Sequence, residues 1–275
     1  MIDYSTVTEA PGIQVTREAA AMLHTRYSCG SRLCRGKDVL ELGCGTGMGL
    51  GLLARSARRL VGGDYTQPLL SRAHGHYQGR VPLLRLDAQV LPFTESCFDL
   101  VILFEAIYYL ARPSDFLNEC HRVLRPDGVL LLCSANREWE GFIPSPHSTR
   151  YFSAVELRQL LSLCGFQGDV YGAFQTSPRT FRQKLAARVR KAALRLHLIP
   201  KTMKGKEILK HLFYGQLVEL PHELEDEMPG VETPVFLAPN GPVTGYKVLY
   251  AVGRRMSKQS EVNERTPRSV VSYSS

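Results

Sequence analysis

Short apolar stretches alternate with amphipathic helical patterns from residue 38 to about residue 171. The apolar stretches contain four to seven residues, the usual length of buried strands, and glycine or proline often separates them from the helical patterns. Such alternation predicts an α/β fold with a doubly wound, mostly parallel sheet and helices on both faces. The predicted strands are 38–42, 59–63, 83–86, 98–104 and 129–134, and the predicted helices are 47–57, 68–76, 113–124 and 153–163.

The last of these helices has clear signals at both ends. Ser153 stands at the N-cap position and Glu156 follows three residues later, which is the pattern of a capping box. Gly165 follows the last apolar position, where a glycine ends many helices in a left-handed conformation.

The alternation stops after residue 172. Residues 173–242 are first basic and then acidic, and the strand pattern returns only at 243–253. We interpret 173–242 as an insertion ahead of the last strand of the sheet. Residues 254–275 are polar and rich in serine, which predicts a disordered tail.

Positive charge is concentrated in this insertion. Residues 176–210 contain eleven lysines and arginines and one acidic residue, whereas the whole chain has a net charge of +8. A basic amphipathic helix over 177–210 could lie on an anionic membrane surface or cap the site and bind an acceptor. A solvated, charged helical cap with no ligand explains the same pattern.

Composition narrows the setting of the protein. Hydrophobic residues make up 44% of the 275 residues, and no apolar run is long enough to predict a transmembrane helix. The N-terminus lacks a secretory signal pattern. The seven cysteines form no CxxC pair, which favours reduced thiols and gives no support for a metal site. We expect a cytoplasmic protein, with peripheral contact at the inner membrane face as an option.

The strongest chemical signal is the run VLELGCGTG at 39–47, in which an apolar strand leads into a glycine-rich turn and a helix. Glycines allow a tight turn and a close approach of ligand to backbone. A dinucleotide-binding loop would have glycine where this chain has Met48. Glu41 also suits a cationic ligand better than a phosphate. S-adenosylmethionine (SAM) carries an ammonium and a sulfonium and has no phosphate.

Three acidic residues follow three of the predicted strands at equal intervals of 23 residues: Glu41, Asp64 and Asp87. Ligands of doubly wound folds bind outside the carboxyl ends of the strands, so these side chains would lie in a row along one ligand. Asp64 is placed to accept hydrogen bonds from ribose hydroxyls, and Asp87 lies near an adenine amino group. Each acid alone could be an ordinary surface residue; the glycine motif and the equal spacing favour a cofactor site.

Five motifs in this order resemble the class I SAM-dependent methyltransferases, and most closely the small-molecule branch related to ubiquinone and menaquinone biosynthesis. The motifs are ELGCGTG at 41–47, GGD at 62–64, DAQVLPF at 87–93, FDLVILFE at 98–105 and HRVLRPDG at 121–128. They cover roughly residues 36–135. Asp127 departs from the glycine usual in that turn, but aspartate tolerates such turns.

The resemblance implies a seven-stranded Rossmann-like sheet with a SAM-binding core at 36–172 and an N-terminal helical lid at 1–35. It also assigns residues to the parts of the cofactor. Those implied to hold its methionine end are Glu41, Gly43, Cys44, Gly45 and Gly47; those for the ribose are Asp64 and Tyr65; those for the adenine are Asp87 and Ala88; and the floor of the cleft is Phe104 and Glu105.

The acceptor side is less defined by sequence. Residues 145–153 weakly resemble a loop of methyltransferases found with sugar and cell-envelope biosynthesis, which suggests a hydroxyl acceptor. A hydroxyl needs a base, and His147 is the first candidate because histidine titrates near neutral pH. A structural hydrogen bond would explain His147 equally well. Tyr108 follows the fourth strand and could line the acceptor pocket or pack on the next helix.

Three function classes remain open. The first is methyl transfer, by preference to oxygen, on a small-molecule, glycan-linked or lipid-linked acceptor, with carbon methylation of a quinone as a variant. The second, an RNA or DNA methyltransferase, suits the basic charge. However, the run FEAI at 104–107 lacks the Asn/Asp-Pro-Pro pattern that serves base amino groups, which argues against a nucleic-acid partner. The third is a SAM-binding protein without catalytic activity.

Overall fold

The computed structural model describes residues 3–176, 217–225 and 229–256. The predicted basic helix and the membrane contact at 177–210 lie outside the described residues, and so does nearly all of the predicted tail at 254–275. In the described part, no helix is long and apolar enough to cross a membrane.

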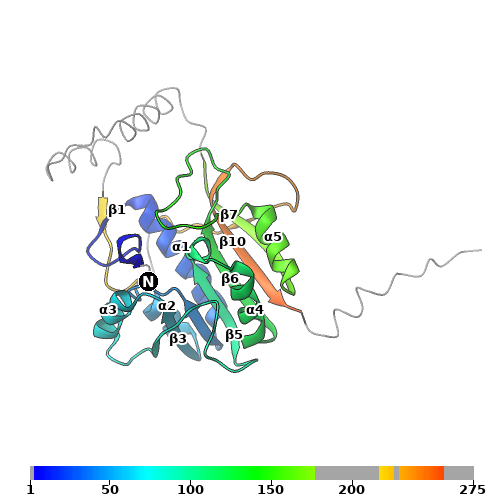
Figure 1. Ribbon diagram of the computed structural model, residues 1–275. Coiled ribbons are helices and arrows are strands. Elements are labelled where there is room, and N and C mark those ends of the chain that lie inside the picture. The colour runs from blue at the N-terminus through cyan, green and yellow to red at the C-terminus, as the bar shows by residue number, and fades with distance from the viewer. Residues whose placement is uncertain (1–2, 177–216, 226–228, 257–275) are drawn as a thin grey trace, which may run out of the picture.

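A central sheet forms the middle layer of the described structure (Figure 1). Five strands on one side of it are parallel, and the remaining three are antiparallel to their neighbours. The order is β4 (Leu83–Arg85), β3 (Arg59–Asp64), β2 (Asp38–Leu42), β5 (Phe98–Phe104), β6 (Leu124–Ala135), β10 (Tyr246–Arg255), β7 (Phe166–Gln175) and β9 (Val235–Phe236).

This sheet confirms the α/β, Rossmann-like prediction and adds one strand. The short edge strand β9 comes from within residues 173–242, which we interpreted as an insertion, and it pairs with β7. Strand β10 begins three residues later than the predicted strand 243–253 and ends at Arg255.

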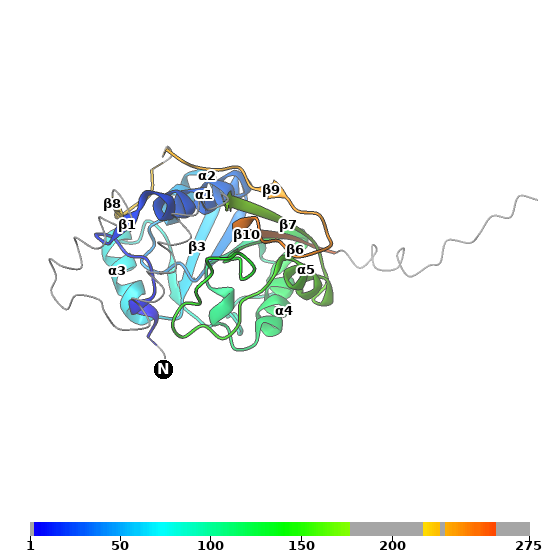
Figure 2. The ribbon, with the colours of Figure 1, turned by 90° about the horizontal axis from the view of Figure 1, so that it is seen from above.

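Helices cover both faces of the sheet, as Figure 2 shows from above. One face carries α1 (Arg17–Cys34), α2 (Leu50–Ser56) and α3 (Gln67–Tyr77), and the other carries α4 (Pro113–Val123) and α5 (Ala154–Leu163). Successive side chains of a strand point to opposite faces. In the fully buried β2, Val39 therefore packs in the α1–α3 layer, and Leu40 and Leu42 pack in the α4–α5 layer.

The predicted end signals of α5 are present. The hydroxyl of Ser153 accepts a hydrogen bond from the backbone N–H of Glu156, and the Glu156 carboxylate accepts one from the N–H of Ser153. Gly165 has the left-handed φ of +81° expected after a helix. Asp127 has a φ of +61°, so aspartate does adopt the turn conformation that glycine supplies in the resembling sequences.

Part of the segment interpreted as an insertion packs against the core. Strand β8 (Leu217–Glu219) pairs antiparallel with β1 (Gln14–Thr16), which precedes α1. Leu220 and Leu224 are buried in the α1–α3 layer. The carboxylate of Glu223 is hydrogen-bonded to the ring of His76 near the end of α3, and it forms an ion pair with Arg80 beyond that helix.

Candidate active site

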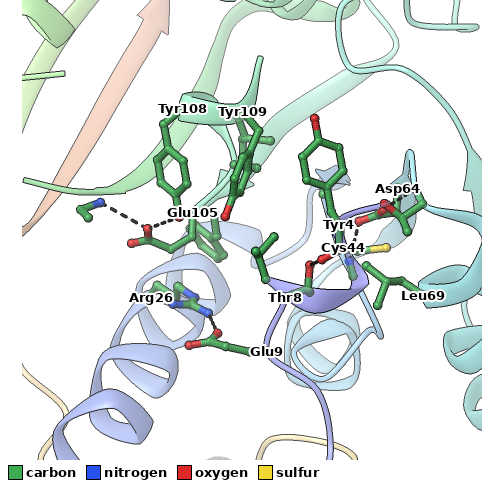
Figure 3. Close-up of a pocket in the computed structure, with 18 of the residues that line it drawn as sticks. Tyr4, Thr8, Glu9, Arg26, Cys44, Asp64, Leu69, Glu105, Tyr108 and Tyr109 are labelled. Carbon is green, nitrogen blue, oxygen red and sulfur yellow. Dashed lines mark hydrogen bonds and ion pairs between the residues drawn. The ribbon is translucent and has the colours of Figure 1, made fainter. Parts of the chain in front are cut away.

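The sheet opens into a pocket of about 670 Å³ at the carboxyl ends of its parallel strands. Parallel strands leave their connecting loops at one edge, so residues that follow several strands meet there. The pocket wall contains a residue from the end of each parallel strand. These residues are Gly43 after β2, Tyr65 after β3, Asp87 after β4, Glu105 after β5 and Ala135, the last residue of β6. Figure 3 shows Asp64, Cys44 and Leu69 at one end of the pocket and Glu105, Arg26 and Tyr108 at the other.

The glycine-rich turn after β2 forms one wall. Gly43 and Gly45 have φ values of +68° and +57°, which side chains with a Cβ rarely adopt. A Cβ on Gly45 would lie 3.0 Å from Cγ2 of Thr8, because the N-terminal segment crosses the turn there. The hydroxyl of Thr46 is buried beside them without a hydrogen-bond partner among the described residues. The turn is thus a tight cradle with an unused polar atom.

Asp64 fixes this cradle at the end of β3. Its Oδ2 accepts a hydrogen bond of 2.8 Å from the N–H of Gly45, and its Oδ1 accepts one of 2.7 Å from the N–H of Thr66. Burial raises the pKa of the Asp64 carboxyl against the lowering effect of these hydrogen bonds. Each carboxylate oxygen keeps a second lone pair, so Asp64 can still accept hydrogen bonds from a ligand.

The end of the pocket beyond Asp64 is mainly apolar. Leu69, Leu86 and Ala88 line it together with the half-exposed Tyr65. Asp87 holds its loop by accepting a hydrogen bond of 2.8 Å from the N–H of Gln89. This end of the pocket therefore combines apolar side chains with one carboxylate.

Two of the predicted site residues lie behind the pocket wall. Glu41 is 1% exposed and points into the α1–α3 layer, where its Oε1 accepts a hydrogen bond of 2.7 Å from the hydroxyl of Tyr27. Gly47 packs against Tyr77, whose hydroxyl donates to the Gly47 carbonyl over 2.7 Å. Both residues shape the turn from below, and Tyr27 stands between Glu41 and the pocket.

Burial gives Glu41 an unusual titration. Its pKa rises from the ordinary 4.5 to about 7 because burial disfavours the carboxylate, although the Tyr27 hydroxyl and the Arg26 charge partly oppose this rise. The pKa of Glu41 is thus higher in the folded protein than in the unfolded chain, where it is 4.5. Proton binding to Glu41 therefore stabilises the fold, and this contribution is complete below pH 4.5. This stabilisation is lost as the pH rises through about 7.

We therefore expect a pH-dependent effect of Glu41→Gln. Above pH 7 the cofactor-free variant should be more stable than the wild type by roughly 3 kcal/mol, because its amide needs no proton. The difference should shrink as the pH approaches 4.5. Urea unfolding of both proteins at several pH values measures it, and a difference independent of pH would contradict the titration of Glu41.

The N-terminal segment and α1 close the opposite side of the pocket. Arg26 of α1 is 8% exposed and forms an ion pair with Glu9. Burial disfavours the guanidinium charge, but Glu9 and Glu105 outweigh burial and raise the pKa of Arg26. Tyr4 packs on Tyr109 with ring centroids 5.0 Å apart, so the short η1 helix (Tyr4–Thr6) covers the cavity.

The lid role expected for residues 1–35 stays a prediction, and Arg26 and Glu9 were not among the residues predicted for the site. A signal for Arg26 was present in the chain. The helical spacing of α1 places Arg26 on one face with the apolar residues Ala19, Met22 and Leu23, and all four line the pocket. Nothing in the sequence indicated that Glu9 reaches the same place.

Glu105 follows β5 with a φ of +50°, a conformation unusual for a residue other than glycine. Its Oε2 accepts hydrogen bonds from the Tyr108 hydroxyl over 2.9 Å and from the N–H of Ala135 over 3.2 Å. The thiol of Cys133 approaches Oε1 at 3.6 Å. Burial, followed by the Glu105 charge, raises the pKa of Tyr108 well above its ordinary value, so Tyr108 stays a donor at neutral pH.

His147 lies at the rim of the same pocket. It is exposed and has a left-handed φ of +65° in the loop before α5. Trp139 lines the rim as well, where the Lys247 ammonium lies 5.5 Å from its ring and pairs with Glu18. The structure thus brings His147, Tyr108 and the cofactor candidates other than Glu41 and Gly47 to one cavity.

The comparisons with known proteins agree with this geometry. Residues 40–132 match the family described as Methyltransferase domain. A probable S-adenosylmethionine-dependent methyltransferase of Mycolicibacterium smegmatis is 38% identical over 148 residues, which cover 51% of this chain and 56% of that protein. A phthiotriol/phenolphthiotriol dimycocerosates methyltransferase of Mycobacterium ulcerans is 40% identical over 116 residues, covering 38% of this chain and 42% of that protein.

The fold is also found in solved structures. The YcgJ protein of Bacillus subtilis matches with a TM-score of 0.55 at 17% identity, covering 86% of this chain and 99% of that one. The chain spans about half the length of the curated relatives it matches. Within this span the motifs, the fold and the relatives agree. The chain carries a class I methyltransferase domain of the small-molecule branch, and the cofactor of this domain is SAM.

Proposed function

We propose that this protein transfers a methyl group from SAM to a hydroxyl of a small, largely apolar acceptor. SAM supplies the methyl group in electrophilic form, bound to a sulfonium. The observation that carries the proposal is one continuous pocket with two unlike ends. One end has the glycine turn and Asp64, and the other has Glu105 among aromatic side chains.

The first end fits SAM. The buried Thr46 hydroxyl lacks a partner among the described residues, and it lines the pocket at the turn that would hold the methionine end. Asp64 would accept hydrogen bonds from the ribose hydroxyls, and Asp87 would accept one from the adenine amino group. The wall also has a formal charge of −3, which suits a cationic cofactor. The five negative side chains are Glu9, Glu18, Asp64, Asp87 and Glu105, and the two positive ones are Arg26 and Lys247.

The second end fits an apolar acceptor. Tyr108, Tyr109 and Trp139 line it, and aromatic walls of this kind bind ring systems and hydrocarbon. The names of several relatives support such an acceptor, among them a ubiquinone biosynthesis O-methyltransferase of Maricaulis maris and a fatty-acid O-methyltransferase of Mycolicibacterium smegmatis. A lipid-linked or glycan-linked acceptor would extend past the rim toward His147.

His147 is the base predicted from the sequence. Its support is its place on the pocket rim, in a loop that also lines the pocket through Thr149. Exposure at the rim would let it exchange protons with solvent. Tyr108 is proposed as a hydrogen-bond donor of the acceptor end.

Isothermal titration tests the proposal. We expect SAM and S-adenosylhomocysteine to bind with micromolar affinity and NAD not to bind, because the wall offers acids where a dinucleotide needs phosphate-binding groups. Transfer of a radiolabelled methyl group from SAM to a panel of phenols, alcohols and quinols then identifies the acceptor class. NAD binding without SAM binding would contradict the cofactor, and methyl transfer only to carbon would contradict the hydroxyl acceptor.

A further inference from the structure

Glu105 differs from the other acids of the pocket wall. Asp64 and Asp87 hold turns by accepting backbone hydrogen bonds. Glu9 and Glu18 each form an ion pair with a positively charged side chain. Glu105 has no ion pair within 4.0 Å among the described residues. It also occupies the left-handed backbone region, which a residue other than glycine rarely adopts. Such a conformation persists where the surrounding structure holds a side chain in place.

The hydrogen bonds of Glu105 leave one oxygen available. Tyr108 and the N–H of Ala135 both donate to Oε2, so that oxygen is fixed. In the described part of the chain Oε1 receives only the Cys133 thiol at 3.6 Å, a long contact with a weak donor. Oε1 therefore has capacity for a hydroxyl proton, in a side chain whose direction is already set.

The charges around Glu105 oppose a second anion. Arg26 is the nearby cation, but Glu9 already forms an ion pair with it. These three side chains have a summed formal charge of −1, so a carboxylate entering next to Glu105 would meet a net negative charge. A neutral hydroxyl meets no such repulsion and can donate to Oε1.

We propose that Glu105 binds the reacting group of the acceptor as an uncharged hydroxyl and receives its proton, so that the site selects hydroxyls over carboxylates. The proposal rests on the proposed function, and it replaces both the cofactor role first expected for Glu105 and the role of base first expected for His147. The acceptor oxygen forms the bond to the methyl carbon, the carbon–sulfur bond breaks with its electron pair left on sulfur, and the hydroxyl proton passes to Oε1.

Figure 3 supports this division of the pocket. Glu105 lies beside Tyr108 and Arg26, at the end opposite to Asp64. Some relatives are named for acceptors that carry carboxylates and not for hydroxyl acceptors. Two of them are a fatty-acid O-methyltransferase and a malonyl-[acyl-carrier protein] O-methyltransferase. The charge around Glu105 argues that this chain differs from them.

Matched pairs of probes test the selection without turnover. The protein is saturated with S-adenosylhomocysteine, and 2-naphthol is compared with 2-naphthoate and 1-octanol with octanoate by calorimetry. We expect the neutral member of each pair to bind about ten-fold more tightly or better in the wild type, because like charges repel at the pocket wall. In Glu105→Gln the difference should fall to about three-fold or less, with an unchanged affinity for S-adenosylhomocysteine.

Turnover provides the second readout. Glu105→Gln should slow methyl transfer to the accepted hydroxyl about 100-fold or more, the usual contribution of a positioned proton acceptor. Glu140→Gln is the matched control, because Glu140 is exposed and is not part of the pocket wall. This variant should keep both the probe selectivity and the rate.

Several results would overturn the proposal. They are carboxylates that bind as well as the neutral probes, no binding of any neutral probe, or a Glu105→Gln variant with weakened S-adenosylhomocysteine affinity. A fourth is loss of transfer in His147→Ala with transfer preserved in Glu105→Gln, which would make His147 the base. If the wild type does not bind S-adenosylhomocysteine at all, the proposed function fails and this inference fails with it.

Discussion

Replacement of Asp64 by alanine is expected to weaken SAM binding about 100-fold or more, since each lost hydrogen bond to a charged group contributes roughly 1.5–3 kcal/mol. The side chain is 7% exposed, and its two oxygens hold the N–H groups of Gly45 and Thr66. Alanine would remove the acceptor proposed for the ribose hydroxyls and release the glycine turn as well. Titration calorimetry with SAM and S-adenosylhomocysteine measures the loss.

A stability measurement separates the two effects of Asp64→Ala. Two backbone N–H groups lose their acceptor, so the cofactor-free variant should also be destabilised by about 1–3 kcal/mol in urea unfolding. Asp115→Ala is a suitable control, because Asp115 lies on α4 in an exposed ion pair with Arg112, away from the pocket. An unchanged SAM affinity in Asp64→Ala would remove Asp64 from the cofactor site.

Replacement of Gly49 by alanine is expected to destabilise the fold by about 3 kcal/mol, the upper end of the usual cost of overpacking a core. A Cβ at Gly49 would lie 1.9 Å from Cε1 of Tyr27, well inside contact distance. The ring cannot easily move, because its hydroxyl is bonded to Glu41 and its edge packs on Phe104 with centroids 5.1 Å apart. Urea unfolding followed by circular dichroism measures the change.

Gly75→Ala is the matched control for this prediction. Gly75 is an exposed residue within α3, and a Cβ there would have no atom within 4 Å. Alanine should be neutral or stabilise the protein by up to about 1 kcal/mol, because it favours the helix more than glycine does. If Gly49→Ala is as stable as Gly75→Ala, Tyr27 is not fixed in the way that the hydrogen bond to Glu41 indicates.

The sequence predicted the parallel part of the fold and its cofactor edge, because both depend on local patterns. We can read the alternation of apolar residues in strands, the positions of glycines and the spacing of Asp64 and Asp87 directly along the chain, without knowing which elements pack together. The structure places both acids on the wall of one pocket. It also places Glu41 behind that wall, since alternate side chains of the buried β2 point to opposite faces and Glu41 shares its face with Val39.

The ion pairs at the proposed acceptor end could not be predicted in the same way, because their residues are distant in the chain and each looks ordinary in its own segment. Glu9 and Arg26 meet only when the N-terminal segment folds back over the glycine turn. Lys247 reaches Glu18 across 229 positions. Ion pairs of this kind depend on where elements pack, and hydrophobic periodicity carries no information about that.

By itself, then, the sequence predicted the α/β fold, the edge of the sheet proposed to bind SAM and the caps of α5, because glycines, acids and strand periods act locally and recur in a fixed order. Tertiary structure alone decided that Glu105 shares a wall with Arg26 and Tyr108, and that Tyr27 seals Glu41 beneath the pocket. The reason is physical. Burial, net charge and free lone pairs are set by all the groups around a side chain, and most of those groups come from other elements of the fold.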